Sequence, residues 1–317
     1  AIAVWEGSLA GHSIIQASTA NISGNLANWA TANDISEVSQ NSYSPSVSLS
    51  GDGSKATVVW YRYVSSPRSA VIQANTASIN SNHAFWAGPL SISVSSYDAL
   101  GPEISSSYGG DKATAVWSIK LTSSANWIVQ SSSVTLDGNT ASWGGPTDLS
   151  DTCSSTFPDP NVSVSGDGTR ATAVRSTCVG TNRIVQSSSS VVGGNSASWA
   201  TPIDLSSATE EASSLGVGLS SDGSRATAVW HTNGYPNENE ILQSSSAEII
   251  GASASWSGVI NVSTSASIGN SRLSLTGDGK IAAVVWKDGQ TPTNTASITQ
   301  AAIGIITYPD CLLYTSD

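Results

Sequence analysis

The residues that could carry chemistry in this 317-residue chain are aromatic and charged side chains that differ between otherwise similar segments. Exposed aromatic rings beside arginine, carboxylate and amide groups are typical of carbohydrate or peptide recognition, because a flat apolar face then lies next to directional hydrogen bonds. They predict a ligand-binding surface. The candidate ligand-binding residues are Tyr61, Arg62, Tyr63, Trp127, Arg175, Arg183, Glu210, Glu211, His231 and Tyr235.

The sequence lacks the common catalytic and metal-binding motifs. The chain contains no H-E-x-x-H, C-x-x-C, G-x-S-x-G, Walker or dinucleotide-binding motif. Its three histidines, His12, His83 and His231, fall in different segments, so we expect no three-histidine metal site. The sequence therefore predicts neither a cofactor nor a metal, and no catalytic residue is assigned. A pair of carboxylates for glycoside hydrolysis stays open.

These residues belong to a repeat that runs along the chain. An alanine- and valine-rich run ending in tryptophan recurs six times, with steps of 55, 57, 58, 55 and 56 residues. Such a regular period predicts one architecture built by repetition. Its last positions are Trp5, Trp60, Trp117, Arg175, Trp230 and Trp286. Arg175 departs from the series, and a guanidinium at a normally buried position needs an acceptor or access to solvent.

The second copy shows what one repeat contains. Residues 46–50, 55–63, 70–77 and 85–93 have the alternating, β-branched and aromatic composition of strands, and a Gly-Asp-Gly-Ser turn separates the first two. Four strands per period of about 56 residues are typical of a propeller blade. We therefore predict an all-β fold, a β-propeller of four-stranded blades with six repeats visible.

Three further series mark the later strands of each repeat. We interpret the glutamines and tryptophans as structural, because an amide satisfies backbone groups and an indole packs between blades. The third series is interpreted as a turn cap. The glutamines are Gln16, Gln73, Gln130, Gln186, Gln243 and Gln300, the tryptophans that open the fourth strands are Trp29, Trp86, Trp143, Trp199 and Trp256, and the third series is Asp34, Ser91, Asp148, Asp204 and Asn261.

The turns 50–53, 165–168, 220–223 and 276–279 read S-G-D-G, S-G-D-G, S-S-D-G and T-G-D-G. They resemble the S-P-D-G-K turn of TolB-like, WD-repeat-like propellers and, more weakly, the Asp-box of sialidase-type propellers. The resemblance implies that these aspartates staple turns and that the first strand of each blade lies nearest the axis. The chain would then start on the second strand of blade one and stop after the third strand of blade six, as a fragment of a six- to eight-bladed ring.

Charge and composition exclude two classes of partner. The net charge is −11 with twelve basic residues, and no basic stripe interleaves with aromatics, so nucleic-acid binding is not expected. No apolar run has the length of a membrane span. Residues 1–310 are predicted to form one propeller domain. Residues 311–317, CLLYTSD, break the repeat and equal one reading frame of a transposase adapter, so we expect a non-native tail on a metagenomic fragment.

Cys153 and Cys178 flank one repeat and form a candidate disulfide. Closing this loop would stabilise the fold by about 3–4 kcal/mol, whereas two unpaired cysteines are the alternative. A disulfide favours an extracellular, periplasmic or cell-surface location.

We thus expect a non-catalytic recognition or scaffold propeller that binds a glycan or protein through variable loops, which a propeller gathers on one face. A sialidase-like glycoside hydrolase or lyase, with catalytic groups on that face or in a part of the protein missing from this chain, is one alternative. A structural spacer of a larger surface protein is the other.

Overall fold

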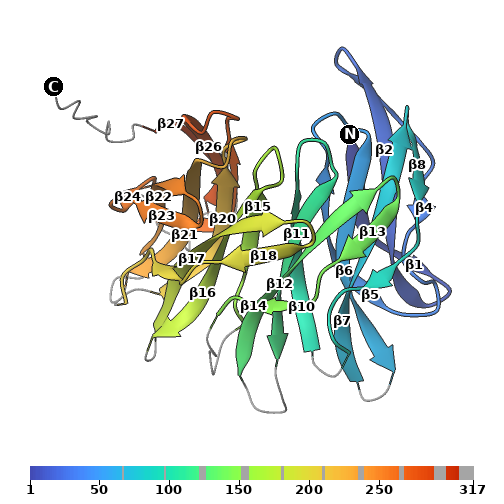
Figure 1. Cartoon of the computed structure of the whole chain (residues 1–317), viewed down its shortest axis with the longest axis horizontal. Helices are drawn as coiled ribbons and strands as arrows, with labels where there is room; N and C mark the ends of the chain where they lie inside the picture. The colour runs from blue at the N-terminus through green and yellow to red at the C-terminus, as the bar shows by residue number, and fades with distance from the viewer. Residues whose placement is uncertain are drawn as a thin grey trace.

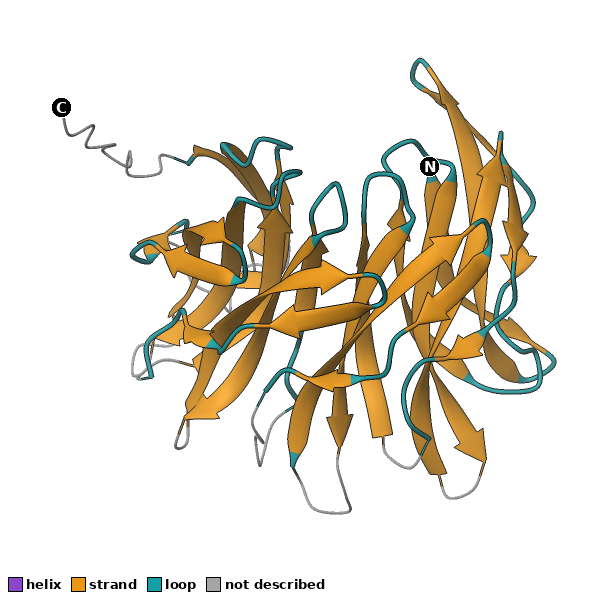
Figure 2. Cartoon of the chain, in the orientation of Figure 1, coloured by secondary structure: helices purple, strands orange, loops and turns teal. Residues whose placement is uncertain are grey.

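The computed structural model describes residues 1–65, 68–95, 98–120, 126–150, 157–179, 182–208, 211–234, 239–263, 268–288 and 298–306. Every regular element in these ranges is a β-strand (Figure 2). No helix that could span a membrane occurs among them. The all-β prediction is therefore confirmed.

The strands form six antiparallel sheets in chain order, numbered here sheets 1 to 6 (Figure 1). Sheet 1 comprises β1 (Ile2–Leu9), β2 (His12–Ser23), β3 (Leu26–Trp29) and β4 (Asn33–Asp34). Sheet 2 comprises β5 (Ser42–Leu49), β6 (Lys55–Ser65), β7 (Arg68–Asn80), β8 (His83–Trp86) and β9 (Leu90–Ser91). Sheet 3 comprises β10 (Asp98–Ser106), β11 (Lys112–Lys120), β12 (Trp127–Asp137), β13 (Thr140–Trp143) and β14 (Thr147–Asp148).

Sheet 4 comprises β15 (Asn161–Val164), β16 (Arg170–Val179), β17 (Asn182–Gly193), β18 (Ser196–Trp199) and β19 (Ile203–Asp204). Sheet 5 comprises β20 (Glu211–Leu219), β21 (Arg225–Gly234), β22 (Asn239–Ile250), β23 (Ser253–Trp256) and β24 (Ile260–Asn261). Sheet 6 comprises β25 (Ile268–Leu275), β26 (Ile281–Asp288) and β27 (Ile298–Ile305).

Each sheet is one blade of a β-propeller. The first strands β5, β10, β15, β20 and β25 pack side by side, and each sheet continues outward through its second and third strands. Trp5 pairs with Gln16 in β1 and β2 as Trp60 pairs with Gln73 in sheet 2, so sheet 1 starts at the second strand of the repeat. In the described part of sheet 6 the strands are the first three. The prediction of six repeats is confirmed.

The fourth strand differs from the prediction. In sheet 2 it is two short strands, β8 and β9, which pair with different parts of β7. In the segment between β8 and β9, Gly88 has a φ of 108° and Pro89 has no N–H to donate, so this segment cannot continue the hydrogen-bond ladder with β7. The outer tryptophan consequently ends the first short strand and does not open the fourth one.

The core lies between neighbouring sheets. Trp60, Trp117 and Trp230 are fully buried there, and the indole N–H of Trp230 donates to the Gln243 side-chain oxygen at 3.0 Å. The glutamine side chain in turn donates from its amide to the residue near the end of the outer strand. The Gln186 amide, for example, donates to the Asp204 carboxylate at 2.7 Å.

The glutamines are structural, as predicted, but they bond to side chains and not to backbone groups. The inner tryptophans Trp60, Trp117 and Trp230 pack between sheets as predicted, whereas the outer Trp29 is 47% exposed. Asp34, Asp148, Asp204 and Asn261 accept the glutamine amide, so their interpretation as turn caps was wrong.

The S-x-D-G turns close one end of the sheets. Asp52 accepts hydrogen bonds from the Ser50 hydroxyl and from the Ser54 N–H and hydroxyl, which lower the pKa of its carboxyl to about 2. A chain of backbone bonds, each 2.7 Å long, also joins the turns of sheets 2 to 6. The aspartates are turn staples, as predicted. The turns at this end thus repeat one set of contacts from sheet to sheet.

Candidate ligand-binding site at the loop-side end

The end opposite the S-x-D-G turns, called here the loop-side end, gathers two sets of connections. One set joins second to third strands, and the other leads from each outer strand to the next sheet. Two hydrogen bonds join the two sets of connections. At the start of β7 the Ala70 N–H donates to the Asp98 carboxylate at 3.0 Å, and at the start of β17 the Asn182 amide donates to the Ala208 carbonyl at 2.7 Å. The variable residues of both sets thus share one end of the molecule.

Three tyrosines form an aromatic cluster on sheet 2. Tyr43 of β5 lies opposite Tyr61 of β6 in the register, and Tyr63 follows on the same side of β6. Their ring centroids are 5.5, 5.6 and 5.8 Å apart. All three side chains are half-buried. Partial burial raises the pKa of Tyr61, so its phenol stays neutral. We call this group the tyrosine cluster.

A β-bulge places the tyrosine cluster. The register of β5 against β6 shifts between Tyr43 and Ser46, where Pro45 has no N–H and Ser44 has a φ of 51°. The Ser44 N–H donates to the Glu6 carboxylate of sheet 1 at 2.8 Å, which holds this strained backbone. The bulge re-aims β5 at its loop-side end.

Arg62 does not join the tyrosine cluster. Successive side chains of a strand point to opposite sides, and its guanidinium lies 3.0 Å from the Glu37 carboxylate and 2.6 Å from the Gln40 side-chain oxygen. Both partners belong to the connection that leads into sheet 2. Arg62 therefore ties that connection to β6, and its predicted contact with a ligand remains a prediction.

The structure brings Trp127 and Arg183 together through Phe157, which sequence reasoning missed. The Trp127 and Phe157 rings meet edge to face with centroids 5.2 Å apart. Arg183 donates to the Phe157 carbonyl at 3.0 Å and to the Ser176 hydroxyl at 2.7 Å. Gly101 allows this packing, because a Cβ there would lie 2.7 Å from the Phe157 ring.

Charged side chains from three sheets, among them Arg183, interact electrostatically with one another. Glu103 follows a second bulge, in β10, and its carboxylate accepts the Ser46 hydroxyl at 2.8 Å. Glu103 interacts electrostatically with Asp159 and Arg272, and Asp159 also interacts with Arg183. Glu103 and Arg272 lie on the inner strands β10 and β25, Asp159 lies in the connection that leads into sheet 4, and Arg183 lies on β17, the third strand of that sheet. We call Glu103, Asp159, Arg183 and Arg272 the charged cluster.

Burial sets the protonation of the two carboxyls. Burial raises the pKa of Glu103, and the Ser46 hydroxyl and Arg272 only partly offset it. Asp159 keeps contact with solvent, but surrounding protein atoms displace much of the water around its carboxylate, and this burial raises its pKa despite Arg183 and Arg272. Two carboxyls with raised pKa values beside two guanidinium groups can exchange protons and bind polar ligands.

The remaining predicted residues lie apart from both clusters. Arg175 is fully buried, and its guanidinium donates to the Ser188 hydroxyl at 3.1 Å and to the Gln186 side-chain oxygen at 3.4 Å. It therefore takes over the contact that the repeat tryptophans make with glutamine. His231 is also buried, so neither side chain reaches the surface.

Glu211 accepts the Arg183 N–H at 3.3 Å and lies at the edge of the charged cluster. Glu210 and Tyr235 lie outside the described residues, and their binding role stays a prediction. Cys178 is disulfide-bonded, while Cys153, its predicted partner, also lies outside the described residues.

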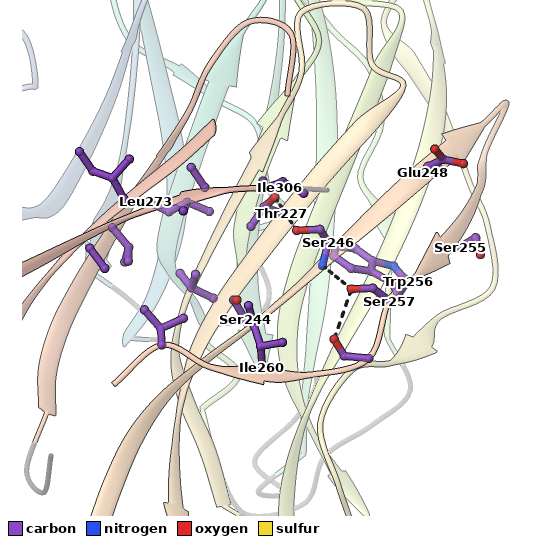
Figure 3. Close-up of a pocket in the computed structure, with 18 residues that line it drawn as sticks. Thr227, Ser244, Ser246, Glu248, Ser255, Trp256, Ser257, Ile260, Leu273 and Ile306 are labelled. Atoms are coloured by element: carbon purple, nitrogen blue, oxygen red, sulfur yellow. Dashed lines mark hydrogen bonds between the residues drawn. The ribbon is translucent and has the colours of Figure 1, made fainter. Parts of the chain in front are cut away.

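A cavity of about 510 Å³ between sheets 5 and 6 has a packing explanation (Figure 3). It is lined by Ser244, Trp256 and Leu273 among others. Ser244 occupies the repeat position of Ser131, whose hydroxyl accepts the indole N–H of Trp199 from the following sheet at 2.9 Å. The cavity thus corresponds to the place where an outer-strand tryptophan packs in the other sheets.

Replacing Glu103 by glutamine should change how stability depends on pH. A carboxyl whose pKa is higher in the folded than in the unfolded state stabilises the fold at low pH, and this contribution is lost as pH rises through the folded-state pKa. Glutamine keeps an acceptor for Ser46 but does not ionise. We therefore expect E103Q to melt above the wild-type protein at pH 8, with the gap narrowing towards pH 4.

Thermal melts across this pH range measure the effect, and Asp52→Asn is the control of opposite sign. The pKa of Asp52 is lowered, so its stabilising contribution is present at neutral pH and is lost only in acid. D52N should therefore melt below wild type at pH 8. An E103Q protein that is less stable than wild type at pH 8 would contradict the burial of this carboxylate.

No metal-binding group of three or more histidine, cysteine or carboxylate side chains occurs within the described ranges. No protein-family model matches the chain, and no curated protein matches it in sequence.

Among solved structures, a Hadza microbial sialidase is 12% identical with a TM-score of 0.49, over 90% of this chain and 60% of the sialidase. A Trypanosoma rangeli sialidase in complex with sialic acid is 11% identical with a TM-score of 0.47, over 92% of this chain and 49% of that one. An α-L-arabinofuranosidase from Podospora anserina is 10% identical with a TM-score of 0.40, over 84% of this chain and 91% of the enzyme. These values are too low to transfer any activity.

Proposed function

We propose that the loop-side end of this propeller binds a carbohydrate. The tyrosine cluster carries the proposal: three half-buried rings lie on the strand pair that also supplies Ser46, the hydrogen-bond partner of Glu103. A sugar ring stacks its apolar face on an aromatic side chain while its hydroxyls need charged or polar partners close by. The tyrosine cluster and the charged cluster supply these two kinds of group next to each other.

The proposed ligand fits the other properties of the chain. The net charge of −11 opposes strongly acidic partners, whereas a sugar with few charges is tolerated. The disulfide at Cys178 supports an extracellular, periplasmic or cell-surface location, where glycans are abundant. A protein ligand would use the same rings, so the choice between the two is made by the experiment.

A glycan array followed by calorimetry tests the proposal. We expect the double variant Tyr61→Ala/Tyr63→Ala to bind the best glycan about 10- to 100-fold more weakly, which corresponds to about 1.4–2.8 kcal/mol. Tyr108→Ala is the matched control, because Tyr108 is 64% exposed but lies on the S-Y-G-G turn of sheet 3, which is the counterpart of the S-x-D-G turns at the opposite end. Equal losses in both variants, or no glycan bound by the wild-type protein, would reject the proposal.

Glycoside hydrolysis is the second candidate, and the raised pKa values of Glu103 and Asp159 favour it. A glycosidase needs one carboxyl that stays protonated to donate to the leaving oxygen and a second carboxylate on the other side of the bond. If the site is catalytic, E103Q and D159N should each abolish release of reducing sugar while glycan binding persists. Absence of turnover in the wild-type protein would leave only the binding function.

A further inference from the structure

The outer side of the junction between sheets 4 and 5 holds a groove in which the sequence departs from the repeat. The groove has a volume of about 480 Å³. Sheet 4 lines it with residues 187–189 of β17 and residues 200–203, which lead from β18 to β19. Sheet 5 lines it with residues 252–254, at the start of β23. We call this cavity the 4/5 groove.

An equivalent groove between sheets 2 and 3 is lined by the same repeat positions but has a volume of only about 280 Å³. Two hydrogen bonds tie its two sides together. The Thr76 hydroxyl donates to the Asn139 carbonyl at 2.9 Å, and the Asn139 amide donates to the Phe85 carbonyl at 2.7 Å. Small-molecule sites have volumes of about 300–1,000 Å³. The 4/5 groove falls within this range, and its counterpart does not.

Both ties are missing from the 4/5 groove because the residues that make them have changed. Ala252 stands at the position of Asn139, four residues before the outer tryptophan, so no carboxamide reaches back to sheet 4. Ser189 stands at the position of Thr76, and its hydroxyl is hydrogen-bonded to the Thr172 hydroxyl of its own sheet at 3.0 Å. The two sides of the groove are therefore not tied together by these side chains.

A buried hydroxyl without a partner lines the 4/5 groove. Ser187 is 0% exposed, and its hydroxyl has no hydrogen-bond partner among the described residues. In the preceding junction Ser131, at the same repeat position, accepts the Trp199 indole N–H at 2.9 Å. The counterpart of that indole is Trp256, whose N–H also has no partner in the described part of the chain. Because unpaired buried polar groups cost free energy, this position favours a ligand that supplies the missing hydrogen bonds.

The lining of the 4/5 groove defines the chemistry of that ligand. None of the described lining residues is charged, so nothing there offsets the cost of moving an ion out of water. Ser187, Thr201 and Ser253 carry hydroxyls, which donate and accept hydrogen bonds as the hydroxyls of a sugar do. Pro202 and Ile203 offer apolar contacts to the C–H groups of a sugar ring. An uncharged ligand rich in hydroxyls fits these groups.

We propose that the 4/5 groove binds a neutral sugar ring. The groove shares no residue with the tyrosine cluster or the charged cluster, so it is a second site and goes beyond the function proposed for the loop-side end. Either site can bind sugar without the other.

NMR spectroscopy of isoleucine methyl groups tests the site. The parent protein is Tyr61→Ala/Tyr63→Ala, which removes binding by the tyrosine cluster, and the probes are cellotetraose, xylotetraose and maltotetraose. We expect at least one probe to shift the Ile203 methyl signal saturably and to leave that of Ile250 unchanged. Ile250 ends the neighbouring strand β22 and is 82% exposed, but it does not line the groove. An Ile203 signal that none of the three probes shifts would overturn the proposal.

Ala252→Asn tests whether the open groove is what binds. The new side chain fills part of the cavity and can restore the tie made by Asn139. We therefore expect A252N to melt no lower than the parent and to bind the sugar about tenfold more weakly or worse. Ile250→Asn is the matched control in the same hairpin and should bind as the parent does. Equal sugar affinity of A252N and the parent would overturn the assignment to this groove.

Ser187→Ala separates binding from folding. Removing a hydroxyl that has no partner in the protein should not lower the melting temperature, whereas sugar binding should weaken about 5- to 10-fold through the lost hydrogen bond. Unchanged sugar affinity would show that the ligand does not use this hydroxyl and would contradict the proposed contact.

Discussion

Replacing Trp230 by alanine is expected to lower the free energy of unfolding by about 3–5 kcal/mol, the range for removing a fully buried aromatic side chain. Trp230 is 0% exposed at the junction of sheets 4 and 5, where it packs with Val174 and Val185. Its removal leaves a cavity and also deprives the Gln243 side-chain oxygen of its donor. Chemical denaturation measured at low protein concentration gives the change.

Trp5→Ala is the matched control for this prediction. Trp5 holds the same repeat position and its indole donates to the Gln16 side-chain oxygen at 3.0 Å, as Trp230 does to Gln243. It is 36% exposed, so its loss should cost about 1 kcal/mol or less in the monomer. The difference between the variants then isolates burial from the hydrogen bond. Equal losses would mean that the tryptophan–glutamine bond, and not packing between sheets, stabilises the junctions.

The repeat architecture was predictable because its signals are local. The strand around Trp60 and the turn at Asp52 each specify their own backbone conformation, and six copies reinforce one interpretation. Gly88 and Pro89, which interrupt the outer strand, were visible in the sequence. We nevertheless predicted one continuous strand over residues 85–93, because its composition is largely apolar.

The charged cluster was harder to predict, because it depends on contacts between distant sheets. Glu103 lies in a strand position where other repeats hold Ser46, Asn161 and Gly216, and its departure from small or neutral residues was the available signal. Arg272 occupies the same position in sheet 6. The bulges that re-aim these strands, and the meeting of sheets 3 and 6, follow only from the assembled propeller.

The two ends of the sheets differ in how regularly their contacts repeat. At one end the turns repeat the same hydrogen bonds in sheet after sheet, and Asp52 is ionised well below neutral pH. At the other end the residues differ between sheets, and burial raises the pKa values of Glu103 and Asp159, which costs stability at neutral pH.

The junction of sheets 3 and 4, which holds Phe157 and Arg183, also provides the second large prediction. Gly144 follows the outer tryptophan of sheet 3, and a Cβ built on it would lie 2.0 Å from the Asn195 carbonyl oxygen of sheet 4. That atom belongs to the backbone, so it cannot move aside as a side chain could. Gly144→Ala should therefore push the two sheets apart and cost about 3 kcal/mol or more.

Gly145→Ala is the control in the adjacent position, because a Cβ there meets no atom within 4 Å. It should change the unfolding free energy by about 0.5 kcal/mol or less. Since Arg183 bonds to the Phe157 carbonyl within the same junction, G144A should also weaken glycan binding while G145A leaves it unchanged. A G144A protein as stable as G145A would show that the outer strand shifts freely, and the close contact between sheets 3 and 4 would then not be what positions the site.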